Sequence, residues 1–237
     1  MQVIVDKIFT NYWEIGKGED VILILHGWQR SIDEWIPVAE NIYGNYRILI
    51  LDLPGFGGTS MPDNAYDTYD YATFVEHFLV KLGVCNCILI GHSFGGRLGI
   101  ILASNTKFIN KLILIDSAGI EKKSLVLNLL DFVVKPLSKF ILVKIKERFE
   151  STDYRSAGKL RKTFVKIINQ DLTYLLSKID VKTIIIWGDK DNILDMRYAK
   201  IFKERIRNSI VRVIWGAGHS PHIEKRKAFL DILNEYI

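Results

Sequence analysis

The sequence has little cysteine and no second pair of metal-binding side chains to accompany it. Cys85 and Cys87 are the only cysteines in the 237 residues. Both stand at the entrance to an apolar run, where two side chains two positions apart on a strand point to the same face and pair poorly. A single C-x-C without a further Cys/His pair is weak support for a metal site. We therefore expect two buried, unreactive thiols and neither a metal nor an organic cofactor.

Long hydrophobic runs and a targeting segment are also missing. No apolar stretch approaches the roughly 18–20 residues needed to cross a bilayer. The first ten residues, Met1–Thr10, lack a basic start and a small-residue cleavage site, and they read as one short alternating strand. No internal repeat or low-complexity segment is present. These absences predict a soluble, cytoplasmic protein without a transmembrane segment, and they leave its oligomeric state open.

The formal net charge of +5 is not spread evenly along the chain. Residues 121–178 contain 13 Lys and Arg against 6 Asp and Glu. No nucleic-acid motif and no patch of interleaved basic and aromatic residues accompanies this surplus, so we expect no nucleic-acid partner. Two interpretations stay open: attraction for an anionic substrate or membrane surface, or ordinary solvation of exposed helices.

Short apolar runs alternate with helical patterns along most of the chain, which is typical of a mostly parallel sheet with crossover helices. Near-continuous Ile, Leu and Val content indicates strands that are covered on both faces. The expected strands are Val21–Leu25, Arg47–Leu51, Cys87–Ile90, Lys111–Ile115, Thr183–Trp187 and Ile210–Trp215. The clearest helices are Tyr69–Leu82, Phe94–Ser104, Met196–Arg207 and His222–Tyr236.

Residues 121–178 interrupt this alternation. They contain no convincing strand but three helical stretches, Leu125–Val134, Phe140–Phe149 and Leu160–Ile168. An all-helical insertion between two strands is typical of a lid over the strand ends, where open α/β sheets bind their ligands. We therefore expect a core made of residues 1–120 and 179–237, with a helical lid of residues 121–178 inserted in it.

The strongest motif is G-H-S-F-G at residues 91–95, between the expected strand Cys87–Ile90 and the expected helix Phe94–Ser104. A nucleophilic serine on a sharp strand-to-helix turn needs a strained backbone, and a glycine two positions to either side leaves room for it. The turn would also place the following N–H groups at a helix N-terminus, where developing negative charge is stabilised. The motif predicts Ser93 as a nucleophile; the alternative is a glycine-rich turn with an idle serine.

A second motif, H-G-W at residues 26–28, directly follows the expected strand Val21–Leu25. With the serine motif, it makes the chain resemble the α/β-hydrolase superfamily, in its serine-nucleophile, lid-containing, carboxylesterase-like branch. In that family this turn supplies one oxyanion-hole N–H and the residue after the nucleophile supplies the other. The resemblance therefore implies the backbone N–H groups of Trp28 and Phe94, and each such donor is typically worth about 2.7–4 kcal/mol.

The general base is expected near the end of the chain. The letters G-A-G-H at residues 216–219 follow the last expected strand and match the family's base loop. A serine hydroxyl needs a base within hydrogen-bond reach, and an imidazole, which ordinarily titrates near pH ~6.5, suits that task. We expect the base to be His219 rather than His222, which begins the last helix and lacks the glycine-flanked turn. Structural roles are expected for His26, His77 and His92.

The acid is expected in the loop W-G-D-K-D at residues 187–191, where the family pattern W-G-x-x-D places it at Asp191. Its task is to hold the imidazole in the right tautomer and to stabilise the imidazolium. Asp189 in the same loop is expected to shape the loop. Asp116 stays open as an alternative acid, because some relatives in the family carry the acid after that earlier strand.

The letters D-L-P-G-F-G at residues 52–57 resemble a further family motif, which we interpret as a structural turn. The order Ser93, Asp191, His219 along the chain is the order of the hydrolase fold. The resemblance covers nearly the whole chain apart from residues 121–178. It implies an α/β-hydrolase fold, with a mostly parallel sheet, helices on both faces and a small helical lid.

The predicted reaction is hydrolysis of a small-molecule carboxylic ester with an apolar acyl group, through an acyl-enzyme on Ser93. A second hypothesis keeps the same three residues but has them cleave a carbon–carbon bond of an anionic keto-acid, as a hydrolase or a lyase. The basic residues 121–178 and Arg97 would suit such a substrate, although an ion-pair role on the helix also explains Arg97. A third hypothesis is a non-catalytic ligand-binding protein of the same fold.

Overall fold

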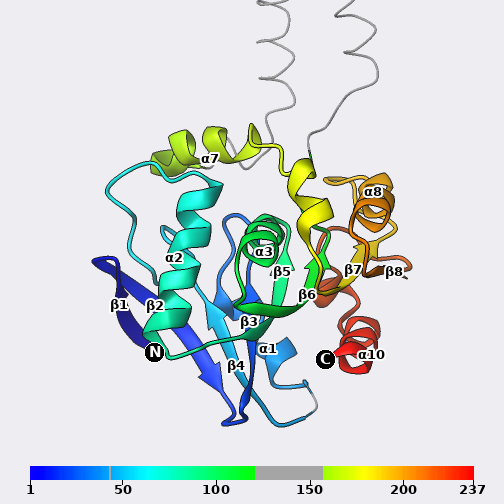
Figure 1. The fold of residues 1–237 in the computed structure, drawn as a ribbon, viewed down its shortest axis with the longest axis horizontal. Helices are drawn as coiled ribbons and strands as arrows, with labels where there is room; N and C mark the ends of the chain where they lie inside the picture. The colour runs from blue at the N-terminus through cyan, green and yellow to red at the C-terminus, as the bar shows by residue number, and fades with distance from the viewer. Residues whose placement is uncertain (43, 121–156) are drawn as a thin grey trace, which may run out of the picture.

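The computed structural model describes residues 1–42, 44–120 and 157–237. These residues form an eight-stranded sheet in the order β1-β2-β4-β3-β5-β6-β7-β8 (Figure 1). The strands from β3 to β8 run parallel to one another, while β1 and β2 are antiparallel to their neighbours. The bounds are Gln2–Val5 (β1), Ile8–Ile15 (β2), Asp20–Leu25 (β3), Tyr46–Leu51 (β4), Cys87–His92 (β5), Ile109–Ile115 (β6), Lys182–Gly188 (β7) and Ser209–Ile214 (β8). The predicted α/β-hydrolase type of sheet is confirmed.

Helices cover both faces of the sheet, as expected from strands that are apolar on both sides. The α-helices are Ile36–Ala39 (α1), Thr68–Lys81 (α2), Phe94–Asn105 (α3), Arg161–Ile168 (α7), Arg197–Arg205 (α8), Pro221–Glu224 (α9) and Arg226–Tyr236 (α10). Short 3-10 turns lie at Ile32–Glu34 (η1), Gly158–Leu160 (η2) and Thr173–Lys178 (η3). The predicted segments Leu125–Val134 and Phe140–Phe149 lie outside the described residues.

The two faces of the sheet are built from different aliphatic side chains. One core packs strand leucines such as Leu23 and Leu89 against α2, α3 and α8. The other packs strand isoleucines such as Ile24 and Ile90 against Trp35, α1 and α10. Because successive side chains of a strand point to opposite faces, the Ile-Leu alternation in the sequence specifies which face each residue buries.

The N-terminal strand differs from the prediction. The expected single strand Met1–Thr10 was wrong: β1 and β2 form an antiparallel hairpin, with Val5 paired to Ile8. Asp6 and Lys7 turn the chain with φ values of 49° and 67°, the left-handed pair that a two-residue hairpin requires. Neither residue is the glycine that usually marks this turn. The alternation of apolar and polar residues therefore continues through it, and the sequence suggests one uninterrupted strand.

Two further expectations are corrected by where elements begin and end. The predicted helix His222–Tyr236 is broken at Lys225, whose φ of −133° is not helical, into α9 and α10. Cys87 is the first residue of β5 and is buried, and burial raises the pKa of its thiol to about 12. Cys85 precedes the strand and is exposed, so the expectation of two buried thiols was wrong for that residue.

The described part of the predicted lid, residues 157–178, contains η2, α7 and η3 and no strand. In Figure 1, α7 lies above α2 and α3. The ring of Phe164 in α7 lies 5.1 Å from the ring of Trp28, in the loop after β3. The backbone N–H of Thr68, at the start of α2, donates to the Gln170 side chain over 2.9 Å. Among the described residues, no helix is long and apolar enough to span a membrane.

Candidate active site

The side chains predicted to act together follow strands that lie side by side. Trp28 follows β3, Ser93 follows β5, Asp191 follows β7 and His219 follows β8. These strands are parallel, so their carboxyl ends meet at one edge of the sheet. In the sheet, β4 lies on one side of β3 and β5 lies on the other, so the strand order reverses direction at β3. Open α/β sheets bind their ligands at such a reversal.

Ser93 sits on a strained turn between β5 and α3. Its backbone φ is 50° and ψ is −107°, a left-handed region that an L-residue adopts only at a cost. The turn is held by the Ser93 N–H, which donates to the Ile115 carbonyl over 3.0 Å. A Cβ on Gly95 would lie 2.2 Å from the Leu25 carbonyl oxygen, so glycine is required where α3 meets the sheet. The sequence motif thus has the strand-to-helix geometry expected of it.

Ser93, His219 and Asp191 form a continuous chain of hydrogen bonds. His219 Nε2 lies 3.0 Å from Ser93 Oγ, and His219 Nδ1 lies 2.8 Å from Asp191 Oδ2. A carboxylate can only accept, so the proton on Nδ1 points to Asp191 and leaves the Nε2 lone pair to accept from the serine hydroxyl. The structure therefore brings together the three residues that the sequence predicts as nucleophile, base and acid.

The Asp191 side chain has no solvent exposure but is well supplied with donors. Its Oδ1 accepts the backbone N–H groups of Ile193 and Leu194 over 2.8 and 2.9 Å. Burial acts to raise the pKa of this carboxyl, but the hydrogen bond and charge of His219, with the two N–H donors, outweigh it and hold the pKa below its usual value. The two N–H donors were missed by the sequence analysis, because backbone donors leave no signature in side-chain letters.

Asp116, the alternative acid, lies at the end of β6 beside this group. One of its carboxylate oxygens accepts the Gly188 N–H over 3.0 Å. Among the described residues its other oxygen has no hydrogen-bond partner. Burial, together with the nearby charge of Asp191, raises its pKa to about 9. It does not hydrogen-bond to His219, so the geometry favours Asp191 over Asp116 as the partner of the base.

The two predicted oxyanion donors lie next to Ser93. Phe94 is the first residue of α3, and the first N–H groups of a helix have no partner within it. A Cβ on Gly27, the residue before Trp28, would lie 3.5 Å from Ser93 Cβ, which places the loop after β3 against the serine. The rings of Trp28 and Phe94 lie 5.5 Å apart in an edge-to-face contact. These contacts bring the two loops that carry the predicted donors beside Ser93, and the oxyanion hole itself stays a prediction.

The remaining histidines are held by other contacts. His26 Nδ1 lies 2.7 Å from the Gly27 carbonyl and its Nε2 accepts the Leu53 N–H over 3.1 Å, which joins the loops after β3 and β4. His77 pairs with Asp6 at the surface over 2.7 Å. His222 is buried and stacks on Trp35 with ring centroids 4.1 Å apart, so it is not the partner of Ser93.

Two charged residues singled out by the sequence have structural contacts. Asp189 accepts the backbone N–H of Gly216, joining the loop after β7 to the loop after β8, as expected of a loop-shaping residue. Arg97 is buried, and its Nη1 donates to the Gln170 carbonyl over 2.8 Å. Burial lowers the pKa of this guanidinium to about 10. Arg97 thus holds residues 157–178 to α3.

An aromatic cluster beside Ser93 was not predicted as part of the site. The Trp28 ring lies 4.8 Å from the ring of Phe56 and 5.1 Å from that of Phe164. Phe94 also contacts Tyr71 edge to face, with centroids 5.1 Å apart. The members come from five separate segments, so no local pattern in the sequence could reveal the cluster.

The chain was compared with known proteins. The family described as alpha/beta hydrolase fold matches residues 20–143, more than half of the chain. Lipase 3 of Moraxella sp. (strain TA144) is 28% identical over 92% of this chain and 76% of its own length. A 2-hydroxy-6-oxo-6-(2'-aminophenyl)hexa-2,4-dienoic acid hydrolase of Metapseudomonas resinovorans is 26% identical, over 93% and 84%. A crystal structure of a membrane phospholipase A, described as a bacterial virulence factor, superposes with a TM-score of 0.81 at 24% identity, over 99% and 84%. The chain therefore belongs to the alpha/beta hydrolase family.

Proposed function

We propose that this protein is a serine hydrolase that cleaves carboxylic esters through an acyl-enzyme on Ser93. The observation that carries the proposal is the unbroken hydrogen-bond chain from Ser93 Oγ through His219 to Asp191. This is the arrangement by which a base activates a weak hydroxyl nucleophile and is itself oriented by a third group. Lipase 3 of Moraxella, a relative over nearly the whole chain, is a lipase by name and supports the same reaction class.

In the first half of the reaction, His219 Nε2 takes the proton of Ser93 Oγ as the oxygen attacks the ester carbonyl. The carbonyl oxygen becomes an oxyanion, which the N–H groups of Trp28 and Phe94 stabilise. Asp191 keeps the proton of His219 on Nδ1 and stabilises the imidazolium that forms. His219 then gives the proton from Nε2 to the departing alcohol, which leaves the acyl group on Ser93.

In the second half, a water molecule replaces the alcohol. His219 removes a proton from the water as its oxygen attacks the acyl carbon, and the same two N–H groups hold the second oxyanion. When the tetrahedral intermediate collapses, His219 returns the proton to Ser93 Oγ and the carboxylic acid departs. The chain's own residues supply every proton transfer in this cycle.

The surroundings of Ser93 support an apolar acyl group. The rings of Trp28, Phe56, Phe94 and Phe164 contact one another next to the serine turn. Phe164 belongs to α7, and a Cβ on Gly55, after β4, would lie 3.1 Å from the Leu160 side chain. Residues 157–178 therefore rest on the loops that follow the strands. We extend the proposal to residues 121–178 as a lid that shapes the acyl-binding side.

The test is a series of p-nitrophenyl esters, from acetate to long acyl chains, on the wild type, Ser93→Ala and Ser104→Ala. Ser104 is a matched control because it lies on α3 and its hydroxyl donates to the Ile101 carbonyl. We expect turnover that peaks at one chain length, a loss on the order of 10⁶-fold in Ser93→Ala, and wild-type turnover in Ser104→Ala. Turnover that survives in Ser93→Ala would contradict the proposal.

A second candidate is hydrolysis of a carbon–carbon bond in an anionic keto-acid, which the relative from Metapseudomonas resinovorans favours by its name. Arg97, which the sequence suggested for an anionic substrate, instead binds the Gln170 carbonyl and lends this candidate no support. The same wild-type and Ser93→Ala samples are assayed on such a keto-acid. This second candidate replaces the ester proposal if three results occur together. The wild type does not turn over esters, a fluorophosphonate still labels Ser93, and the keto-acid is cleaved.

A further inference from the structure

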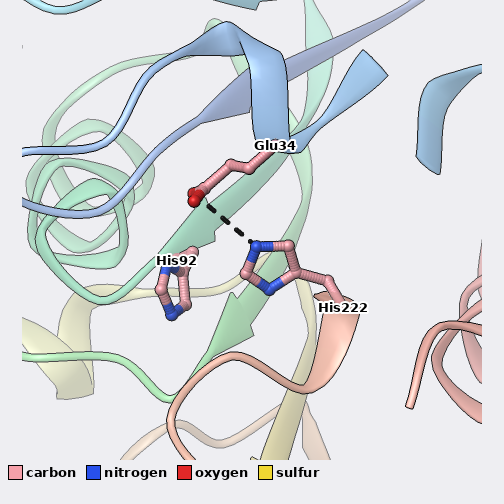
Figure 2. A group of neighbouring side chains, drawn as sticks. All are labelled: Glu34, His92 and His222. Atoms are coloured by element: carbon pink, nitrogen blue, oxygen red, sulfur yellow. Dashed lines mark ion pairs between the residues drawn. The ribbon is translucent and has the colours of Figure 1, made fainter. Parts of the chain in front are cut away.

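A second group of buried polar side chains lies directly behind the serine, histidine and aspartate group. Glu34 ends η1, His92 ends β5 beside Ser93, and His222 lies in α9, three residues after His219 (Figure 2). One oxygen or nitrogen from each of the three lies within 4.8 Å of the other two. Both imidazoles are fully buried and Glu34 is 10% exposed. Figure 2 shows the Glu34 carboxylate pointing toward the two rings.

Each of the three side chains has a polar atom that no other described residue satisfies. These atoms are Glu34 Oε1, His92 Nδ1 and both ring nitrogens of His222. Leaving one buried polar atom without a hydrogen bond costs about 1–3 kcal/mol, and here four such atoms lie together. A cation placed among them would satisfy the carboxylate oxygen and one lone pair of each imidazole at once.

The hydrogen bonds around the group leave lone pairs available. His92 Nε2 lies 2.7 Å from the carbonyl oxygen of His219. A carbonyl can only accept, so Nε2 carries the proton and Nδ1 keeps its lone pair. Stacking on Trp35 covers the face of the His222 ring but not its in-plane nitrogens.

We propose that Glu34, His92 and His222 bind a divalent transition-metal ion such as Zn²⁺. Two neutral imidazoles and one carboxylate are a common ligand set for this ion, and hard cations such as Mg²⁺ prefer oxygen ligands. His222 Nε2 and Glu34 Oε1 are 3.6 Å apart, close to the about 3.4 Å that separates two ligands of a tetrahedral zinc. The His92 ligand atom lies within 4.8 Å of both.

The contacts outside the three ligands fit this role. Metal-bound histidines usually donate their other ring N–H to a carbonyl or carboxylate, and His92 does so to His219. Arg30 lies 3.8 Å from Glu34 Oε2 and leaves Oε1 for the metal. The metal would join η1, β5 and α9 behind the base loop. Because the site is buried behind the base loop, the metal ion would have a structural role and would not contact the substrate.

The test uses protein stripped with a chelator and titrated with Zn²⁺ by calorimetry and with Co²⁺ by visible absorption. We expect about one tightly bound ion per chain and the intense bands of a four-coordinate Co²⁺. Glu34→Gln and His222→Gln should each weaken binding more than about 100-fold, since changes outside the ligand shell alone cost about 10–100-fold. Thermal midpoints of the chelator-treated variants show whether each one folds without metal.

Two controls separate this site from others that contain histidine. His77→Gln removes the exposed pair with Asp6, an obvious place for adventitious surface binding, and should leave tight binding unchanged. Asp191→Asn disturbs the group of Asp116, Asp191 and His219, whose atoms also approach within 4.8 Å, and should likewise leave it unchanged. Binding lost in either control but kept in Glu34→Gln overturns the proposal. Absence of tight binding by the wild type overturns it too, whatever the variants do, and leaves a hydrogen-bonded water as the common partner.

Discussion

The loops after β6 and β7 present two carboxylates that are alike in burial and opposite in behaviour. Asp116 and Asp191 both have side chains without solvent exposure, at the ends of neighbouring parallel strands. Asp191 accepts from His219 and from two backbone N–H groups, and its pKa is lowered. Among the donors in the described part of the chain, Asp116 accepts only the Gly188 N–H, and its pKa is raised to about 9.

Burial disfavours the charged form of both carboxyls, so burial alone cannot explain the difference. Each donor that points at a carboxylate stabilises its charge, and within residues 1–42, 44–120 and 157–237 Asp191 has three donors where Asp116 has one. Asp116 therefore keeps its proton near neutral pH, and it provides no negative charge for an imidazolium. The number of donors in each loop decides which carboxyl can serve His219.

The largest expected effect comes from replacing each of the two aspartates by asparagine in turn. Asp191→Asn should lower kcat on a p-nitrophenyl ester by about 10⁴-fold, because an amide no longer fixes the proton of His219 on Nδ1. Asp116→Asn should lower it by less than about tenfold, since the native group is already uncharged. Steady-state kinetics of both variants measure this. Equal losses in the two variants would break the comparison.

A smaller effect is expected on the pH dependence of stability. The pKa of Asp116 is about 9 in the folded protein, against an ordinary value of 3.8 for an aspartate in an unfolded chain, so between these pH values only the unfolded chain releases the proton. The contribution of Asp116 to stability is complete below pH 3.8 and is lost as the pH rises toward 9, by at most about 1.4 kcal/mol per pH unit. Asn cannot ionise, so Asp116→Asn lacks this loss.

Thermal midpoints of wild type and Asp116→Asn, recorded from pH 4 to pH 9, check this expectation. As the pH rises through this interval, the thermal midpoint of the variant should increase relative to that of the wild type. Parallel curves would mean that Asp116 is ionised in the folded protein, and the contrast with Asp191 would then fail.

The smallest effect is expected when Asp116→Asn is added to Asp191→Asn to give a double variant. If Asp116 does not replace the missing acid, the double variant should match Asp191→Asn to within about threefold in kcat. Steady-state kinetics of the two variants provide the measurement. A further loss of more than about tenfold would show that Asp116 takes over as acid when Asp191 is absent.

Much of the fold was predictable because its signals are local. The observed bounds of the parallel strands lie within a residue or two of the predicted bounds. Runs of Ile and Leu that form buried strands, and glycines that form turns, can be recognised from residues that are close together in the sequence. The predictions failed where the deciding contact is distant or unmarked. The Asp6-Lys7 turn has no glycine, and the break at Lys225 lies next to Glu224, whose carboxylate accepts the N–H groups of Gly218 and Ser220.

The candidate site divides in the same way. The sequence by itself determined which residues follow each strand, and hence that Ser93, Asp191 and His219 reach one edge of the sheet. Only the tertiary structure decided that Asp191 rather than Asp116 is supplied with donors, that Arg97 faces Gln170, and that Glu34, His92 and His222 meet. The physical reason is that charge, protonation and coordination depend on burial and on partners from distant segments, which residue order alone does not place.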